Sequence, residues 1–155
     1  VGAARMAETV TTPALGWAPK SELGDGEWEW RVSSVDAGGA IIGSTSWRGF
    51  VVDGTAPEVD AWSPQGTVKR NANFVVTFSE PVQGVTSKTF RLRIKGGTTN
   101  LLAKVTLNKA GTKATLNPTV NLKSKKSYTL SLTTDITDVA GNPLTEAFSW
   151  KVVGK

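Results

Sequence analysis

The sequence predicts an all-β protein built mainly as an antiparallel sandwich, and three observations support this fold class. Apolar and polar side chains alternate over many short segments, as they do along strands with one buried face. Glycine, proline and asparagine separate these segments at short, regular intervals. No segment repeats its apolar residues with the period of an amphipathic helix, so we expect very little helix.

The clearest strand signal lies in residues 73–85, which read NFVVTFSEPVQGV. Phe74, Val76 and Phe78 point to one side of an extended segment, and the residues between them point to the other. Pro81 then follows, and proline has no N–H to donate to a ladder. We predict that this segment is the central strand of the sandwich and that its functional interest lies in the turn after it.

Seven alternating segments follow one another in the last two thirds of the chain. They cover residues 58–62, 74–79, 89–95, 102–108, 113–117, 127–133 and 147–153. The turn residues Ser63–Gly66 are predicted to end the first of them. About seven short strands with turns between them, over about a hundred residues, are typical of an Ig-like sandwich.

Residues 1–53 contain fewer strand signals. Segments 11–18, 27–36 and 46–52 predict about three strands, and the glycine-rich residues 37–44 predict a loop. Trp28, Trp30 and Val32 share one face, which is predicted to point inward. Three strands are too few for a closed sandwich. A chain segment of fewer than about 40–60 residues also buries too little apolar surface to be more than marginally stable by itself.

A change of charge marks the predicted boundary between two domains. Residues 1–53 contain four Lys/Arg and seven Asp/Glu, whereas residues 54–155 contain fourteen and six. The linker-like sequence DGTAP at 53–57 lies where the balance changes. We therefore predict a partial module at 1–53 and a complete sandwich domain at 54–155.

Both predicted domains resemble known families. The second contains TAP at 55–57, SPQG at 63–66, FVVTFSEPV at 74–82, YTLSLTTDITDVAGNPL at 128–144 and FSWKV at 148–152. These motifs resemble a bacterial Ig-like domain of the type found in S-layer and other large surface proteins. In the first domain, Trp28, Trp30 and Val32 before a glycine-rich turn resemble the last strands of a fibronectin type III module; the alternative is a three-stranded appendage packed on the second domain. The resemblance implies a structural spacer, adhesion or display module of an exported protein, located at the cell surface or secreted, and working without catalysis. The alternatives are a module that binds a polysaccharide or an anionic cell-wall polymer, and an accessory domain of a secreted hydrolase.

The composition removes most catalytic chemistry. The chain contains no histidine and no cysteine, so catalysis by Ser-His-Asp or Cys-His groups has no residues to use. Glu27 and Glu29 share a strand face but alternate with tryptophans, which indicates a solvated face rather than the paired carboxylates of a glycosidase. No catalytic residue is predicted, and no stretch is long enough to insert into a membrane.

A calcium site is one candidate in the second domain. In an Ig-like order, the loops after the second, fourth and sixth strands lie at one end, together with the linker residue Asp53. Oxygen-rich loops suit Ca²⁺. The candidate ligands are Glu80, Asp135, Asp138 and Asn142. We favour the alternative, in which Asp138 and Asn142 hydrogen-bond their own turn and Glu80 caps its bend, because the spacing lacks the dense acidic ladder of calcium loops. No other cofactor is predicted.

Tryptophans and a basic face are the other candidate binding residues. Trp28, Trp30 and Trp150 fall on faces predicted to be core. The less constrained rings, candidates for glycan binding or for packing between modules, are Trp17, Trp47 and Trp62. We favour packing. The basic residues Arg91, Arg93 and Lys95 point outward together, with Lys104 and Lys151 expected alongside.

The basic face has two interpretations. It suits an anionic cell-wall polymer, or it serves solubility and edge protection. Nucleic acid is not predicted, because no aromatic residues interleave with these cations. The remaining expected partners are neighbouring domains of the same polypeptide and a second copy, since a three-stranded fragment with free edges favours dimerisation.

Overall fold

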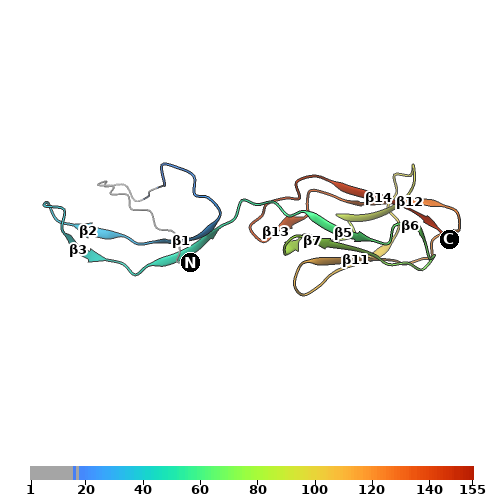
Figure 1. The fold of residues 1–155 in the computed structure, drawn as a ribbon, viewed down its shortest axis with the longest axis horizontal. Coiled ribbons are helices and arrows are strands. Elements are labelled where there is room, and N and C mark those ends of the chain that lie inside the picture. Colours follow the sequence, from blue (N-terminus) through green and yellow to red (C-terminus); the bar gives the residue numbers. More distant parts are fainter. Residues whose placement is uncertain (1–15, 17) are drawn as a thin grey trace. The chain divides into compact units, whose positions relative to one another are not determined.

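The computed structural model describes Gly16 and residues 18–155, and the chain forms two compact units, residues 1–55 and 56–155. Every regular element in the described part of the chain is a β-strand (Figure 1). The predicted all-β fold class is therefore confirmed. No helix in that part has the length and apolar character needed to cross a membrane.

The second unit, called the sandwich below, consists of two four-stranded sheets. Their strand orders are β10-β11-β7-β5 and β6-β14-β12-β9. The strands are β5 (Val59–Ser63), β6 (Gly66–Val68), β7 (Phe74–Phe78), β9 (Phe90–Ile94), β10 (Ala103–Leu107), β11 (Lys113–Pro118), β12 (Ser127–Leu132) and β14 (Phe148–Gly154). All seven strands predicted in this region are present, and the Ig-like sandwich is confirmed.

The first strand of the sandwich changes sheets. β5 pairs antiparallel with β7, and after a cis Ser63–Pro64 peptide the chain continues as β6 in the opposite sheet. Ser63–Gly66 therefore does more than end a strand, because it carries the chain across the sandwich. β6 runs parallel to β14, which makes this sheet mixed rather than purely antiparallel.

The core lies between the two sheets and is made by the alternation visible in the sequence. Phe74, Val76 and Phe78 are buried on β7, and Tyr128, Leu130 and Leu132 are buried on β12. Every apolar side chain that is buried in the described residues belongs to the sandwich. Each large side chain fully buried contributes about 1.5–3 kcal/mol, so the sandwich has a core of its own.

The described part of the first unit is a long hairpin. Its strands are β1 (Gly26–Trp30), β2 (Ser33–Val35), β3 (Ile41–Ser44) and β4 (Arg48–Val52), with β1 paired to β4 and β2 paired to β3. Asp36 closes the turn, because its Oδ1 accepts hydrogen bonds from the N–H groups of Gly38 and Ala40, both at 2.9 Å.

The hairpin differs from the predicted three strands. The predicted strand 27–36 is interrupted between β1 and β2, and the predicted loop 37–44 ends in β3. Gly16 and Ala18 lie outside any strand, and the rest of the predicted segment 11–18 reaches residues that the structure does not describe.

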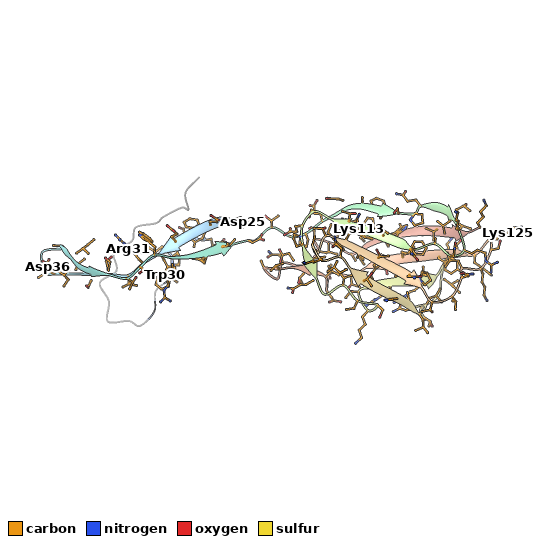
Figure 2. All side chains as sticks on the ribbon, turned by 90° about the horizontal axis from the view of Figure 1, so that it is seen from below. Asp25, Trp30, Arg31, Asp36, Lys113 and Lys125 are labelled. Atoms are coloured by element: carbon orange, nitrogen blue, oxygen red, sulfur yellow. The ribbon has the colours of Figure 1, made fainter. Side chains whose placement is uncertain are left out.

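The inward-facing prediction for the hairpin was wrong for Trp30 and Val32, whereas Trp28 is half-buried. Trp30 is 45% exposed and Val32 is 58% exposed, because a two-stranded ribbon has no second layer among the described residues to cover either face. Arginine covers two of the rings instead. The guanidinium of Arg48 lies 5.7 Å from the Trp30 ring, and that of Arg31 lies 4.7 Å from the Trp47 ring. Figure 2 shows side chains filling the sandwich, whereas those of the hairpin project from a single layer.

Candidate functional site at the loop end of the sandwich

Three segments distant in sequence meet at one end of the sandwich, which we call the loop end. The backbone of Glu58 hydrogen-bonds Ser79, with Glu58 N–H donating to Ser79 Oγ at 2.9 Å and Ser79 N–H donating to the Glu58 carbonyl at 3.0 Å. A short ribbon joins β8 (Val82–Gln83) to β13 (Thr137–Asp138). The exit of β7 therefore lies beside the loop that follows β12, as the Ig-like order predicts.

Asp138 organises the loop after β12. Its side chain is 1% exposed. Oδ1 accepts hydrogen bonds from the N–H groups of Gly141 at 2.6 Å and Asn142 at 2.8 Å, and Oδ2 accepts one from Asn142 Nδ2 at 2.8 Å. Gln83 Nε2 donates to the Asp138 carbonyl at 2.9 Å. The carboxylate thus holds the turn 138–142 in place.

The charge of Asp138 is stabilised by these donors. Burial alone would raise the pKa of its carboxyl, because a charged group loses hydration. Hydrogen bonds from the Asn142 side chain and from the backbone of Asn142, Gly141 and Ala140 outweigh burial, so the pKa lies below the usual 3.8. The folded protein therefore stabilises the ionised form of the Asp138 carboxyl.

Two glycines let neighbouring loops approach at this end. Gly84 has φ +74°, and a Cβ there would lie 2.9 Å from the carbonyl oxygen of Asp135. Gly111 has φ +75°, and a Cβ there would lie 3.1 Å from Cβ of Pro81. Neither contact can be predicted from the sequence, because a glycine indicates a turn without revealing which loop it faces.

Replacing Gly84 with alanine should destabilise the sandwich by about 1–3 kcal/mol, because a side chain is strained at this φ and would also strike the Asp135 carbonyl. The matched control is Gly96→Ala, where φ is +80° and no atom lies within 4 Å of the new Cβ. Urea unfolding of both variants measures the difference. Equal losses of unfolding free energy in the two variants would show that the contact with the Asp135 carbonyl adds nothing to the cost of backbone strain.

The four candidate calcium ligands are not arranged alike. A carboxylate oxygen of Glu80 lies within 4.8 Å of one from Asp138. Asn142 turns its N–H₂ group toward Asp138, and Asp135 accepts a hydrogen bond from Thr133 Oγ1 at 3.0 Å. Because both oxygens of Asp138 already accept hydrogen bonds, the arrangement supports the turn interpretation that the sequence favours.

We expect millimolar Ca²⁺ to leave the melting temperature of the protein unchanged, because Asp138 is engaged by its own loop. A calorimetric scan with calcium and with a chelator tests this. A rise of several degrees that disappears in Asp138→Asn would establish the alternative, a metal site at the loop end.

The three candidate tryptophans have different settings. Trp17 lies outside the described residues. Trp47 is 39% exposed under Arg31 in the hairpin. Trp62 is half-buried on β5 and packs edge-on against Phe148, with ring centroids 4.7 Å apart. The packing of Trp62 is therefore part of the sandwich itself.

The candidate basic residues lie on the outer face of one sheet. On that face the register places Arg93 opposite Thr129, and Thr129 opposite Lys151 on the next strand. Arg91 lies opposite Ser131 in the neighbouring row, and Lys95 follows β9 directly. Lys104 does not join them, because β10 belongs to the other sheet.

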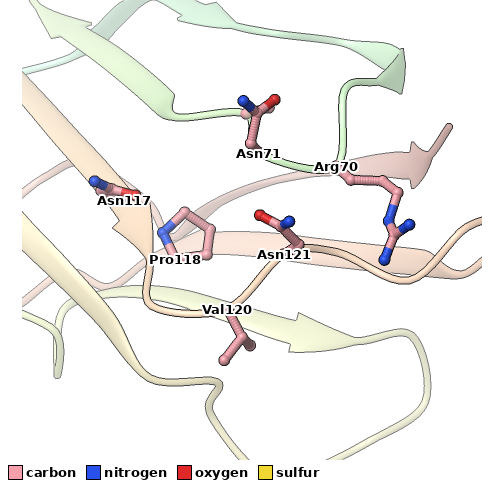
Figure 3. A pocket seen from close by; sticks show the side chains of 7 residues that line it. Arg70, Asn71, Asn117, Pro118, Val120 and Asn121 are labelled. Carbon is pink, nitrogen blue, oxygen red and sulfur yellow. The ribbon is translucent and has the colours of Figure 1, made fainter.

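Hollows in the sandwich are small. One, of about 60 Å³, is lined by Arg70, Asn71, Asn117 and Asn121 among others (Figure 3). Another, of about 290 Å³, lies between Pro57 and Phe148. Pockets that hold drug-sized ligands usually measure about 300–1,000 Å³, so the first hollow is too small to enclose such a ligand and the second lies at the lower limit.

Residues 53–152, about two thirds of the chain, match the bacterial Ig-like domain family. The chain belongs to this family. No curated protein matches the sequence significantly. The fibronectin-like resemblance of the hairpin region stays a prediction.

Solved structures similar to the Ig-like domain include the N-terminal part of the bacterial S-layer protein SbsC, at 26% identity and a TM-score of 0.49, covering 65% of this chain and 24% of that one. The structure of SbsC domains 1–6 is 25% identical with a TM-score of 0.48, and the match covers 64% of this chain and 14% of that one. The copper resistance protein PcoC from Escherichia coli is 16% identical with a TM-score of 0.51, and the match covers 65% of this chain and 100% of that one. PcoC shares the fold. The chain thus spans a quarter or less of the S-layer chains.

Proposed function

We propose that the Ig-like domain is a non-catalytic spacer or display module of a larger bacterial surface or secreted protein. The observation that supports this is the position of its two ends. The chain enters at the loop end, where Glu58 is bonded to Ser79. It leaves at the opposite end, where Lys155 N–H donates to the Val68 carbonyl and Lys125 N–H donates to the Gly154 carbonyl, both at 2.8 Å. Figure 1 shows this arrangement within the sandwich.

Entry and exit at opposite ends make the domain a link of fixed length. β14 runs between them as one seven-residue strand, roughly 24 Å at about 3.4 Å per residue. The core on its inner side and the bonded turn of Asp138 restrict bending. Such a link separates whatever precedes it from whatever follows it.

Spin labels at the two ends test the proposal. The chain has no cysteine, so Ala140→Cys and Ser124→Cys in the full chain define unique exposed labelling positions. We expect one narrow distance distribution between the labels, unchanged by calcium or by wall polymers. A broad or multimodal distribution would contradict a rigid spacer.

A second candidate function is binding of a linear anionic polymer, and the rows on the outer sheet face favour it. Two arginines and a lysine alternate there with hydroxyl side chains, and no acidic residue lies on β9, β12 or β14. Arg93 Nε donates to Asn100 Oδ1 at 2.6 Å, which orients one cation. Phosphate-bearing polymers are recognised by such donors.

The second candidate predicts salt-dependent retention on teichoic acid that falls in an Arg91→Gln, Arg93→Gln variant. Lys104→Gln on the other sheet is the matched control and should not change retention. Glycan binding, by contrast, would be lost in Trp47→Ala, whereas Trp62→Ala also removes packing against Phe148 and needs a check of folding beside it. The spacer proposal expects no retention in any of these assays.

The hairpin is the proposed site of self-association. Its exposed apolar side chains include Ile41, Ile42 and Val51, which are 61–69% exposed. Among the residues that the structure describes, this two-stranded ribbon has no strand paired to either outer edge, and such edges favour pairing with another strand. We expect light scattering at high concentration to report dimers that Ile42→Lys weakens. A monomeric mass throughout would contradict this.

A further inference from the structure

We propose a further function for the Ig-like domain: it bears tension along the polypeptide through a terminal clamp. The clamp is the pairing of β6 (Gly66–Val68) with residues 152–154 of β14. This rests on the proposed spacer function, because tension reaches the domain only when other parts of the protein are attached at both ends.

The clamp joins the first part of the sandwich directly to its last strand. Val152 lies opposite Gly66, Val153 opposite Thr67, and Gly154 opposite Val68. Lys155 N–H then extends the ladder by donating to the Val68 carbonyl at 2.8 Å. Force that passes along β5 into β6 is therefore transmitted directly to the last strand across these bonds.

The parallel direction of the two strands decides how the bonds are loaded. Pulling the chain at the loop end draws β5 and β6 backward, and pulling at the exit draws β14 forward. The two strands are thus displaced along their own axes in opposite directions. Ladder bonds run across the strands, so this shear loads them together. An antiparallel terminal pair would place both ends on one side and break bonds one at a time.

Trp150 adds a bond to the clamp. Its indole N–H donates to the Pro64 carbonyl at 3.2 Å, between β5 and β6. The ring is 7% exposed and packs near Phe90 and Phe148, and the bond is partly buried. The crossing segment of the first strand is thereby held to β14 as well.

The order of rupture follows from the ladders. β5 is bonded to β7 over four register pairs with an irregularity between Val59 and Ala61. β14 is bonded to β12 over six pairs in addition to the clamp. The N-terminal side is therefore the weaker route. We expect β5 to leave β7 first, and the clamp to set the main barrier.

Pulling the full chain from two sets of handles tests the proposal. Handles at the chain termini load the clamp in shear. Cysteines at Lys104 and Asn117, opposite each other on β10 and β11, instead peel neighbouring antiparallel strands apart. We expect the terminal geometry to need a clearly higher unfolding force, because its bonds break together. Equal forces in the two geometries would overturn the proposal.

Two aromatic variants separate the clamp from general stability. Trp150→Phe removes the bond to Pro64, and Tyr128→Phe removes the bond that the Tyr128 hydroxyl accepts from Lys123 N–H at 2.8 Å. A hydrogen bond worth about 1 kcal/mol predicts roughly fivefold faster unfolding under constant terminal force for Trp150→Phe. Tyr128 lies opposite the clamp residue Val152 on the next strand, but Tyr128→Phe leaves the bonds between β6 and β14 in place, so it should lose thermal stability without this excess. Identical behaviour of the two variants in both pulling geometries would contradict the clamp.

The spin-label distances keep this test separate from the spacer proposal. A narrow distance distribution with equal forces in the two geometries would retain the spacer and reject the clamp. A broad distribution would reject the spacer, whatever the force measured.

Discussion

Replacing Leu130 with alanine should lower the free energy of unfolding of the sandwich by about 2–5 kcal/mol, the range for a buried leucine that leaves a cavity. Leu130 is fully buried at the centre of β12, between Leu92 and Trp150 on the neighbouring strands. Strands on both sides restrict collapse around the missing atoms. The melting temperature of this 100-residue unit should fall by roughly 10 °C or more.

The matched deletion in the hairpin is Trp30→Ala. It removes a larger side chain, but one that is 45% exposed and covered on one side only by Arg48. We expect the unfolding of the sandwich to change by less than about 0.5 kcal/mol, as for surface positions. Calorimetry of both variants in the full chain makes the comparison. Equal losses would show that hairpin and sandwich unfold as one cooperative structure.

The contrast between these two residues shows why the sequence predicted the sandwich well and the hairpin poorly. Leu130 and Trp30 both belong to regular alternation, and alternation records which face a strand prefers to bury. It does not record whether a covering layer exists. In the sandwich, a second sheet covers the face of β12. In the described hairpin, no such layer is present, so apolar side chains with the same alternation are exposed.

β6 was missed for a different reason. Three residues, GTV, are too few to show alternation, and their partner residues 152–154 lie far away in sequence. Pairing over such a separation is set by tertiary topology. Because the terminal clamp depends on β6, the proposed role in bearing tension could not be predicted without the register of β6 and β14.

The loop end was partly predictable. The Ig-like strand order brought Glu80 near the loop of Asp138 and Asn142, and their spacing predicted a self-bonded turn. Burial of Asp138 was not predictable, because aspartate is rarely buried unless its oxygens find partners. The direction of each side chain also could not be read from the sequence, and it is this direction that separates a turn from a set of metal ligands.

Replacing Asp138 with alanine should lower the melting temperature by many degrees at neutral pH, because the buried acceptor of the hydrogen bonds from Ala140, Gly141 and Asn142 disappears. The N–H groups of Gly141 and Asn142 then lose their partner inside the protein. Asp138→Asn should be milder, since its carbonyl oxygen still accepts, although its N–H₂ group opposes that of Asn142. Asp135→Asn is the exposed control and should cost little.

The pH dependence gives this prediction a second, independent readout. The pKa of Asp138 is lower in the folded state than its usual 3.8, so the folded protein holds the proton less tightly than the unfolded chain. The stabilisation is therefore fully present above the usual pKa and is lost as the pH falls through the folded pKa. The difference in stability between wild type and Asp138→Asn should be constant from pH 7 down to about pH 5 and shrink below about pH 4. A difference that persists undiminished at the lowest pH would show that shape, rather than charge, is what Asp138 contributes to the turn.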